Sequence, residues 1–225
     1  MISFKGKHFM KPIILMAIRW YVAYALSYRD IEEILQDRGL VIDHATINCW
    51  VIEYSSELAA AFKTKKKPVK SSWRMDETYI KVKGKWMYQY RAVDKDGDTI
   101  DCYFAKNRDK KAALAFFRKA IHSCGKPSVV NIDKSGSNTS ALNEINKNMP
   151  ESGKIKIRQN KYLNNMIEQD HRFIKKITRP ILGFKAIHSA RATLDGIELH
   201  HMLRKGQHVN SANQSIFEQF YSLAA

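Results

Sequence analysis

The stretch RMDETYIKVKGKW, from Arg74 to Trp86, decides the fold of the larger part of this chain. It is rich in β-branched and aromatic residues, which predicts a β-strand. Successive side chains of a strand point to opposite faces, so Asp76 falls on the same face as Ile80 and Val82. A carboxylate beside apolar side chains is costly unless a partner compensates its charge. Asp76 is therefore the first candidate functional residue.

The residues that follow predict a mixed α/β domain. Gly84 and Asp96-Gly97 supply turns, so residues 72–105 predict three antiparallel strands joined as a meander. Beyond them, the apolar patterns predict helices and strands in alternation, which is typical of helices packed on a sheet. The expected elements are a helix over 109–124, a buried strand over 128–133, a helix over 140–149, a strand over 154–159, a helix over 163–177, and a further helix over 189–203 that covers the sheet.

Residues 1–62 predict an all-helical domain. Pro12–Leu26 predicts a buried amphipathic helix that begins with Pro12. Its apolar run is interrupted by Arg19 and is therefore too short for a signal peptide or a membrane span. Ser27 predicts a helix start, Gly39 a helix end and Asp43 a second start. Two short helices joined by a Gly-containing turn form the helix-turn-helix pattern, although any helical hairpin can show it.

A helix-turn-helix would place the first residues of its second helix against DNA bases. The candidates are His44, Thr46 and Asn48, of which Asn48 is suited to adenine. Residues 63–71 form a basic, aperiodic stretch that predicts a linker before a second domain over residues 72–225. Three of its lysines, Lys65, Lys66 and Lys67, are candidates for contacts with DNA phosphates, and a solvated loop is the alternative.

Composition points to a polyanionic partner. The chain has 225 residues, 44% of them hydrophobic, and a formal net charge of +16. Nucleic acid is the first expectation and an anionic membrane surface the second, although a merely basic protein has the same charge. The three cysteines, Cys49, Cys102 and Cys124, show no C-x-x-C spacing, so the sequence predicts neither a disulfide framework nor a zinc site. A reducing cytoplasm is expected.

Three acidic residues stand out by their placement. Asp76 lies on the first strand, Asp133 ends the fourth, and Glu168 lies in the helix over 163–177. If the first and fourth strands are neighbours, the carboxylates converge, and a divalent cation would offset their repulsion. Oxygen ligands suit Mg²⁺ or Mn²⁺, and two such ions would support phosphoryl transfer. However, any chain with 22 acidic residues contains such a triple by chance.

The segments MDETYIKVKGKW, NIDKSG and KYLNNMIEQDHRFIKKI resemble the three catalytic motifs of bacterial DDE transposases, and most closely those of the insertion-sequence-six family. Residues 134–167, 34 in number, separate Asp133 from Glu168, as in the DD(34)E subgroup. The resemblance implies an RNase H-like catalytic domain behind a helix-turn-helix domain. It implies that Asp76, Asp133 and Glu168 bind two Mg²⁺ ions, for which Mn²⁺ can substitute.

The resemblance also implies that Lys175, seven residues after Glu168, contacts DNA at the catalytic site. His171 and Arg172 share the helical face of Glu168, where an exposed, solvated surface is the alternative to a DNA contact. The sequence departs from the family at three positions. Ile132 stands where relatives usually have Thr, and Asn138 stands near where a Tyr is common; neither removes a metal ligand. Cys49 stands where the second helix of relatives often has Arg, which puts the base-reading surface in question.

The resemblance implies a transposase that binds the terminal inverted repeats of its insertion sequence, nicks the ends with water and joins the 3′-hydroxyls to target DNA. It implies a homodimer or higher homo-oligomer on DNA in the bacterial cytoplasm, without a membrane or a nucleotide cofactor. Two alternatives stay open from the residues. One is a non-catalytic helix-turn-helix DNA-binding regulator, and the other is a metal-dependent nuclease without joining activity.

Overall fold

A computed structural model describes residues 2–134, 136–147 and 149–225 of the chain. These residues form two compact units. The helical unit contains residues up to Lys67 and residues from Ile174 onward, and the sheet unit contains Pro68–Phe173. The chain therefore leaves the helical unit after its first helices and returns to it near the end.

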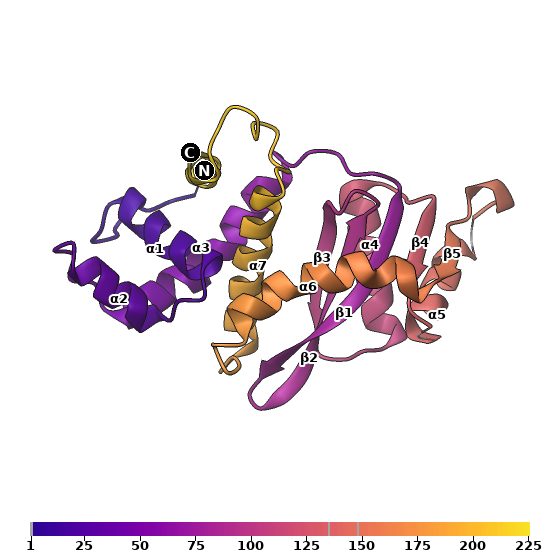
Figure 1. Cartoon of the computed structure of the whole chain (residues 1–225), viewed down its shortest axis with the longest axis horizontal. Coiled ribbons are helices and arrows are strands. Elements are labelled where there is room, and N and C mark those ends of the chain that lie inside the picture. The colour runs from indigo at the N-terminus through magenta and orange to yellow at the C-terminus, as the bar shows by residue number, and fades with distance from the viewer. Residues whose placement is uncertain (1, 135, 148) are drawn as a thin grey trace. The chain divides into compact units, whose positions relative to one another are not determined.

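The sheet unit contains five strands in the order β3-β2-β1-β4-β5 (Figure 1). Neighbours β1, β2 and β3 are antiparallel, whereas β4 is parallel to both β1 and β5. This confirms the predicted meander followed by a parallel strand. The elements are β1 (Ser72–Val82), β2 (Lys85–Asp94), β3 (Thr99–Ala105), α4 (Lys110–Cys124), β4 (Val129–Ile132), α5 (Gly136–Asn146), η1 (Glu151–Gly153), β5 (Lys156–Gln159), η2 (Lys161–Asn164) and α6 (Asn165–Thr178).

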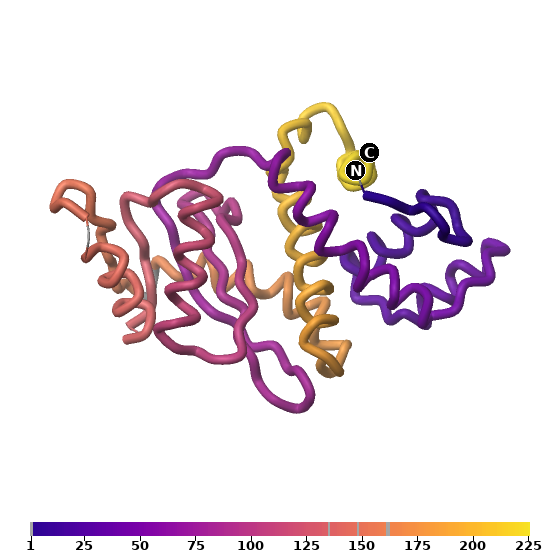
Figure 2. The backbone as a smooth tube through the Cα atoms, turned by 180° about the vertical axis from the view of Figure 1, so that it is seen from behind, coloured from indigo at the N-terminus to yellow at the C-terminus, as the bar shows by residue number. Residues whose placement is uncertain are grey.

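Helices cover both faces of this sheet. Helix α4 lies on one face, as the view from behind shows (Figure 2), and its Phe116 and Phe117 are fully buried against Trp73 and Tyr90. Helix α6 crosses the opposite face (Figure 1). Helix α5 ends at Asn146, short of the predicted 149, and residue 148 of that expected helix lies outside the described residues.

The β1–β2 hairpin closes through the two residues Lys83 and Gly84. Both have positive φ angles, of 50° and 76°. A two-residue turn with left-handed backbone at both positions matches the twist of the strands that it joins. The register pairs Val82 with Lys85 and continues without a shift to Trp73 and Asp94. This long, regular ladder fixes which side chains of the two strands share a face.

The helical unit begins with three helices whose starts the sequence predicts correctly. They are α1 (Lys11–Ala23), α2 (Tyr28–Gln36) and α3 (His44–Lys63). Ser27 and Asp30 form a capping box at α2, and the Asp43 side chain caps α3. The expectation of two short helices is wrong for the second, because α3 continues for 20 residues. Its apolar stripe continues through Leu58 and Phe62, both fully buried.

The C-terminal helices belong to the helical unit. They are α7 (Ile187–Arg204) and α8 (Ile216–Ser222). Helix α7 packs along α3, and a side chain at Gly196 would come within 2.7 Å of Val22 and 3.0 Å of Ser55. The prediction that this segment covers the sheet is therefore wrong. Its close contacts are with α1 and α3.

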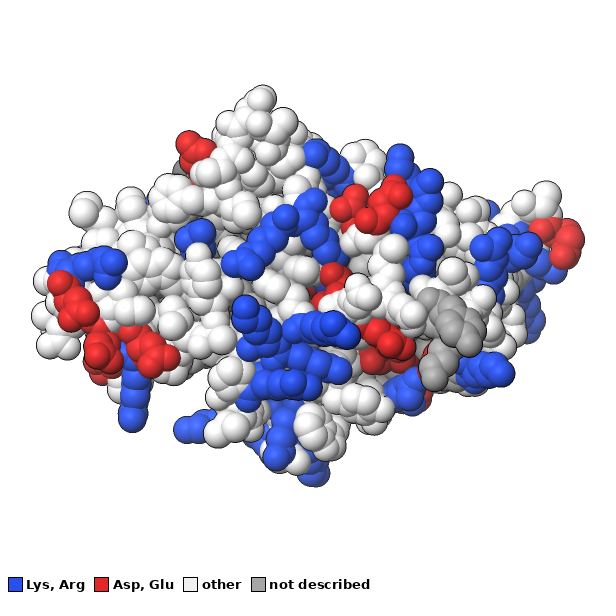
Figure 3. Space-filling model, in the orientation of Figure 1, with Lys and Arg blue, Asp and Glu red and all other residues white. Residues whose placement is uncertain are grey.

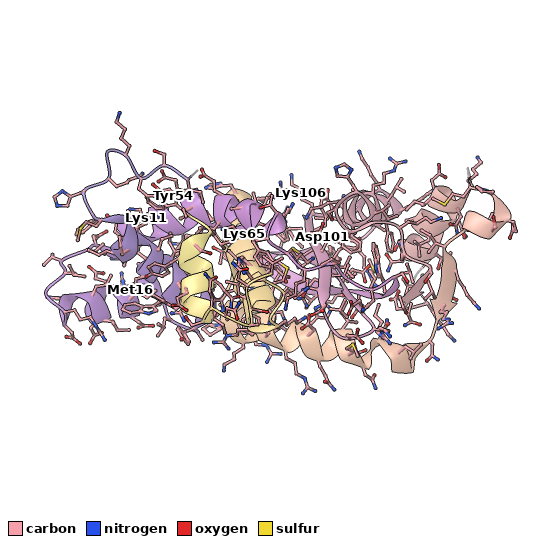
Figure 4. All side chains as sticks on the ribbon, turned by 90° about the horizontal axis from the view of Figure 1, so that it is seen from above. Lys11, Met16, Tyr54, Lys65, Asp101 and Lys106 are labelled. Carbon is pink, nitrogen blue, oxygen red and sulfur yellow. The ribbon has the colours of Figure 1, made fainter. Side chains whose placement is uncertain are left out.

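The expected linker is partly ordered by the C-terminal segment. The backbone N–H of Lys67 donates to Gln207 O at 2.8 Å, and that of Val209 donates to Lys65 O at 2.9 Å. The ammonium of Lys65, labelled in Figure 4, donates to Ser222 O at 2.8 Å. These bonds tie the end of α3 to residues beyond α7. Among the described helices, none is both long enough and apolar enough to span a bilayer.

Candidate active site

Parallel pairing of β1 and β4 brings Asp76 and Asp133 together. Trp73 pairs with Val130, and Arg74 pairs with Asn131, where the ladder ends. Two residues further along each strand stand Asp76 and Asp133, at the point where the strands separate. Carboxylate oxygens of Asp76, Asp133 and also Glu77 lie within 4.8 Å of one another. We call these three residues the acidic cluster.

Glu77 is a member of the cluster that the sequence analysis did not single out. Its side chain is 3% exposed, and two groups hold it. The Asn138 amide donates to Glu77 Oε1 at 3.0 Å, and Arg108 Nη2 donates to Glu77 Oε2 at 3.2 Å. Burial raises the pKa of Glu77, and the Asn138 hydrogen bond and the Arg108 charge oppose that rise. The sequence feature that could have identified Glu77 is its position directly after Asp76, on the opposite side of the strand.

Arg108 and Asn138 contact Asp133 as well as Glu77. Arg108 Nη2 lies 2.8 Å from Asp133 Oδ2, and the Asn138 amide nitrogen lies 3.4 Å from Asp133 Oδ1. One guanidinium thus bridges two carboxylates, and its positive charge offsets their repulsion. Asn138 replaces a Tyr that the resemblance leads one to expect, and in this structure it is fully buried and joins the cluster through hydrogen bonds.

Helix α6 is held beside Asp76 by three polar contacts. His171 Nε2 lies 3.4 Å from Asp76 Oδ2, and the His171 side chain is 4% exposed. Arg91 and Asp170 form a buried ion pair at 2.8 Å. Asn164, just before the helix, accepts a hydrogen bond from the Asn131 amide on β4. His171 is therefore a buried contact to the site, and the alternative of a solvated position is wrong for it.

Glu168 lies on α6 one turn before His171, and its side chain is exposed. It does not belong to the acidic cluster in this structure. The structure thus brings Asp76 and Asp133 together and leaves Glu168 outside the 4.8 Å group, on the helix that contacts Asp76. Further along the helix, Arg172 is exposed and Lys175 is half-buried in the last turn.

The donor set of the acidic cluster fits a hard divalent cation. All three of its residues offer carboxylate oxygens and none offers sulfur or imidazole, which favours Mg²⁺ or Mn²⁺ over zinc. Among the described residues a second group lies close enough to hold an ion, formed by Glu32, Asp43 and His44. It is more exposed, and the Glu32–His44 contact at 2.9 Å already joins α2 to α3.

The predicted DNA-contacting residues have different environments. His44 stands at the start of α3 with its ring bonded to Glu32, Thr46 and Asn48 are half-buried, and Cys49 is exposed. Lys65 donates to Ser222 O, as described above, and the Lys67 ammonium donates to Ser211 Oγ at 2.6 Å. Lys66 forms an isolated β-bridge with His208 through its backbone.

Basic side chains cover more of the visible surface than acidic side chains do. Figure 3 shows extended groups of Lys and Arg, with Asp and Glu confined to smaller separate groups. The distribution agrees with the net charge of +16. A surface of this kind attracts polyanions, and the acidic cluster is a local exception to it.

Comparison with known proteins identifies the family. A family model described as "DDE domain" matches residues 70–207, which include Asp76, Asp133 and Glu168. The transposase for insertion sequence element IS257 in transposon Tn4003, from Staphylococcus aureus, is 44% identical over 90% of this chain and 88% of its own length. This chain belongs to the insertion-sequence-six family of DDE transposases.

Further relatives agree with this assignment. The transposase for insertion sequence-like element IS431mec from Staphylococcus aureus strain Mu50 is also 44% identical, over 90% of this chain and 88% of that protein. Among solved structures, the HTLV-2 integrase catalytic core domain in complex with magnesium (trimeric form) is 19% identical, with a TM-score of 0.46, over 59% of this chain and 86% of that one. The predicted α/β fold class, a mixed sheet flanked by helices, is confirmed by the strand order and the helices on both faces.

Proposed function

We propose that this transposase binds the terminal inverted repeats of its insertion sequence, nicks them with water and joins the 3′-hydroxyls to target DNA. The observation that carries the proposal is the convergence of Asp76 and Asp133 where β1 and β4 separate, beside α6. Buried strands hold the two carboxylates, so the site is preorganised for a charged reactant. The family of the chain supports the same reaction class.

The first step hydrolyses one phosphodiester bond, and the second exchanges one phosphodiester bond for another. In the first, water attacks a phosphorus atom at the element end, and the bond to the 3′-oxygen breaks to leave a 3′-hydroxyl and a 5′-phosphate. In the second, that 3′-hydroxyl attacks a target phosphodiester and forms a new bond to phosphorus, while the target's own 3′-oxygen leaves. The second step conserves the number of phosphodiester bonds, so neither step needs a nucleotide cofactor.

We propose that Asp76, Asp133 and Glu168 hold two Mg²⁺ ions, for which Mn²⁺ can substitute. When bound, such ions lower the pKa of an attacking oxygen and stabilise the leaving oxygen. The Asn138 amide, which contacts both Glu77 and Asp133, positions Asp133. His171 on α6 positions Asp76. Glu168 would approach the cluster from α6, because its helix already contacts Asp76 through His171.

DNA binding would divide between the two units. The start of α3, with His44, Thr46 and Asn48, would read the terminal repeat, because the first residues of a recognition helix face base edges. Arg172 and Lys175 on α6 would contact the DNA backbone near the reacting phosphate. Lys65, Lys66 and Lys67 would add electrostatic attraction to phosphates. Joining two ends of one element requires at least a dimer.

A joining assay tests this function. Two labelled duplexes carry the terminal repeat, one continuing into flanking DNA and one ending in a free 3′-hydroxyl at the repeat, and each is incubated with supercoiled plasmid, protein and Mg²⁺. The proposal predicts that the label becomes covalently attached to the plasmid, and that EDTA prevents it. Cleavage of the end without joining would indicate a nuclease, and binding without either reaction would indicate a DNA-binding regulator. Both results would contradict the proposal.

A further inference from the structure

One face of the β1–β2 hairpin carries exposed aromatic side chains. Tyr79 pairs with Tyr88 across the ladder, and Lys81 pairs with Trp86. Directly opposed residues of antiparallel strands point to the same side, so these four residues share a face. We call them the aromatic face. Tyr79 is 51% exposed and Trp86 is 60% exposed, whereas Ile80, Val82 and Met87 on the other side are buried.

The rings of the aromatic face form one cluster. The ring centroids of Tyr79 and Trp86 lie 6.3 Å apart, and those of Tyr79 and Tyr88 lie 5.4 Å apart. Trp is rarely left this exposed, because it loses much favourable burial. Exposed Lys83 and Lys85 at the turn add positive charge next to Lys81. Aromatic rings interleaved with lysines are the features with which proteins bind unpaired nucleic acid, through base stacking and phosphate contacts.

The aromatic face begins beside the acidic cluster. Glu77 and Tyr79 are two residues apart on β1 and point to the same side, about 6.6 Å from one another along the strand. From the cluster toward the hairpin turn, the same side presents Glu77, Tyr79 and Lys81 in succession. A DNA strand that leaves the cluster along this side would meet the rings first.

We propose that the aromatic face binds unpaired nucleobases of the DNA strand next to the reacting phosphate. The inference rests on the proposed function and names a second contact surface for the same DNA. In a duplex the faces of each base are covered by its neighbours, so a flat ring can stack only on a base that has left the helix or lies in a single strand. Tyr79 and Trp86 offer their rings to such bases, and Lys81 pairs with the adjoining phosphate.

Fluorescence polarisation with two labelled DNAs tests the proposal. One is a blunt duplex that carries the terminal repeat, and the other is the same duplex with a tail of unpaired thymines, both with EDTA present to prevent cleavage. The wild-type protein is expected to bind the tailed DNA more tightly. Replacing both rings, Tyr79→Ser with Trp86→Ser, is expected to weaken binding of the tailed DNA by about 5- to 140-fold for each stacked base, and to leave the blunt duplex unaffected.

Two controls separate ring chemistry from folding. Tyr79→Phe with Trp86→Phe keeps both rings exposed and is expected to retain the preference for the tailed DNA. Phe217→Ser removes an exposed ring in α8, 47% exposed, and is expected to change neither affinity.

A further variant tests the phosphate contact. Lys81→Gln is expected to reduce the salt dependence of tailed-DNA binding by about one phosphate contact.

Three results would overturn the proposal. A wild-type protein that binds both DNAs equally lacks the preference, and this leaves the proposed function standing. A preference that survives in the double Ser variant places the contact elsewhere. A wild-type protein that binds neither DNA would contradict the proposed function as well.

Discussion

Arg91 and Asp170 form an ion pair at 2.8 Å, with side chains 0% and 10% exposed, and this pair joins the centre of the sheet to α6. Arg91 stands directly opposite Asp76 in the β1–β2 ladder. The pair therefore anchors the helix that carries Glu168 on the same face and at the same level of the sheet as Asp76. A buried ion pair of this kind fixes a position more than it adds net stability.

Breaking this pair from one side is expected to be strongly destabilising. Arg91→Met leaves the Asp170 carboxylate buried without its cation, so we expect the free energy of unfolding to fall by about 3–5 kcal/mol. Arg91→Met with Asp170→Leu replaces both charges by apolar groups and is expected to recover most of that loss. Urea unfolding of the wild type, both single variants and the double variant measures the coupling. Additive losses in the double variant would contradict the pairing.

Removing Arg108 is expected to make the protein more responsive to divalent metal. In Arg108→Gln the Glu77 and Asp133 carboxylates lose the cation that bridges them, so repulsion destabilises the metal-free form. A loss of about 1 kcal/mol lowers Tm by about 2–4 °C for a chain of this length. Mg²⁺ should then raise Tm more in the variant than in the wild type.

Thermal unfolding with and without Mg²⁺ measures this effect. Arg118→Gln, which removes an exposed arginine of α4, is the matched control and should behave like the wild type. Equal Mg²⁺-induced shifts in Arg108→Gln and the wild type would show that Arg108 does not compensate the acidic cluster.

His200 predicts a pH dependence of stability in the helical unit. Burial, followed by the charges of Arg204 and Arg19, lowers the pKa of His200 to about 3, from an ordinary value of 6.5. Between these values the unfolded chain binds a proton that the folded chain does not. The stability that the folded protein gains by keeping His200 neutral is therefore fully present above pH 6.5. It is lost as the pH falls toward 3, by up to about 1.4 kcal/mol per pH unit.

The variant His200→Gln cannot take up that proton. Its free energy of unfolding should therefore depend less steeply on pH below 6.5 than that of the wild type. Urea titrations at a series of pH values measure both slopes. Parallel slopes across this interval would mean that His200 is not held neutral by the folded protein.

The start of α3 gives a prediction about sequence recognition. Asn48→Ala removes an amide suited to adenine, which should cost about 1–3 kcal/mol of binding to the terminal repeat and little on unrelated DNA. Competition between repeat and scrambled duplexes measures the difference. Ala60→Ser alters an exposed side chain near the other end of α3 and serves as the control. A uniform loss on both DNAs would assign Asn48 to the phosphate backbone and contradict base reading.

The sequence predicted the sheet because its signals are local. The alternation around Asp76, the turn at Gly84 and the short apolar run before Asp133 are each visible in a few residues. From those signals the strand types and the antiparallel meander follow. The meeting of Asp76 with Asp133 was expected on the condition that the first and fourth strands are neighbours, and the structure pairs them. The caps of α2 and α3 were predicted for the same reason, since a capping side chain and the backbone that it binds are neighbours in sequence.

The features that the sequence did not predict depend on distant contacts. Glu77 joins the acidic cluster only because Arg108 and Asn138 meet it from two other segments, 31 and 61 residues away. The sequence of α7 does not indicate which element the helix packs against, and the prediction placed it on the sheet. The close approach of Gly196 to Val22 and Ser55 shows that it packs against α1 and α3. The sequence left His171 open between a DNA contact and a solvated position, because nothing near it in sequence indicates Asp76.

The most direct test of the account concerns Glu168, the proposed metal ligand that stands outside the acidic cluster in this structure. The measurement compares Mg²⁺-dependent joining of a labelled terminal repeat by the wild type, Glu168→Gln and Glu151→Gln. Glu151 is a matched control because its side chain is 88% exposed and its ion-pair partner among the described residues is Lys154, the residue that follows η1. The account predicts that Glu168→Gln abolishes joining and retains DNA binding, while Glu151→Gln joins normally. Full joining by Glu168→Gln would contradict it.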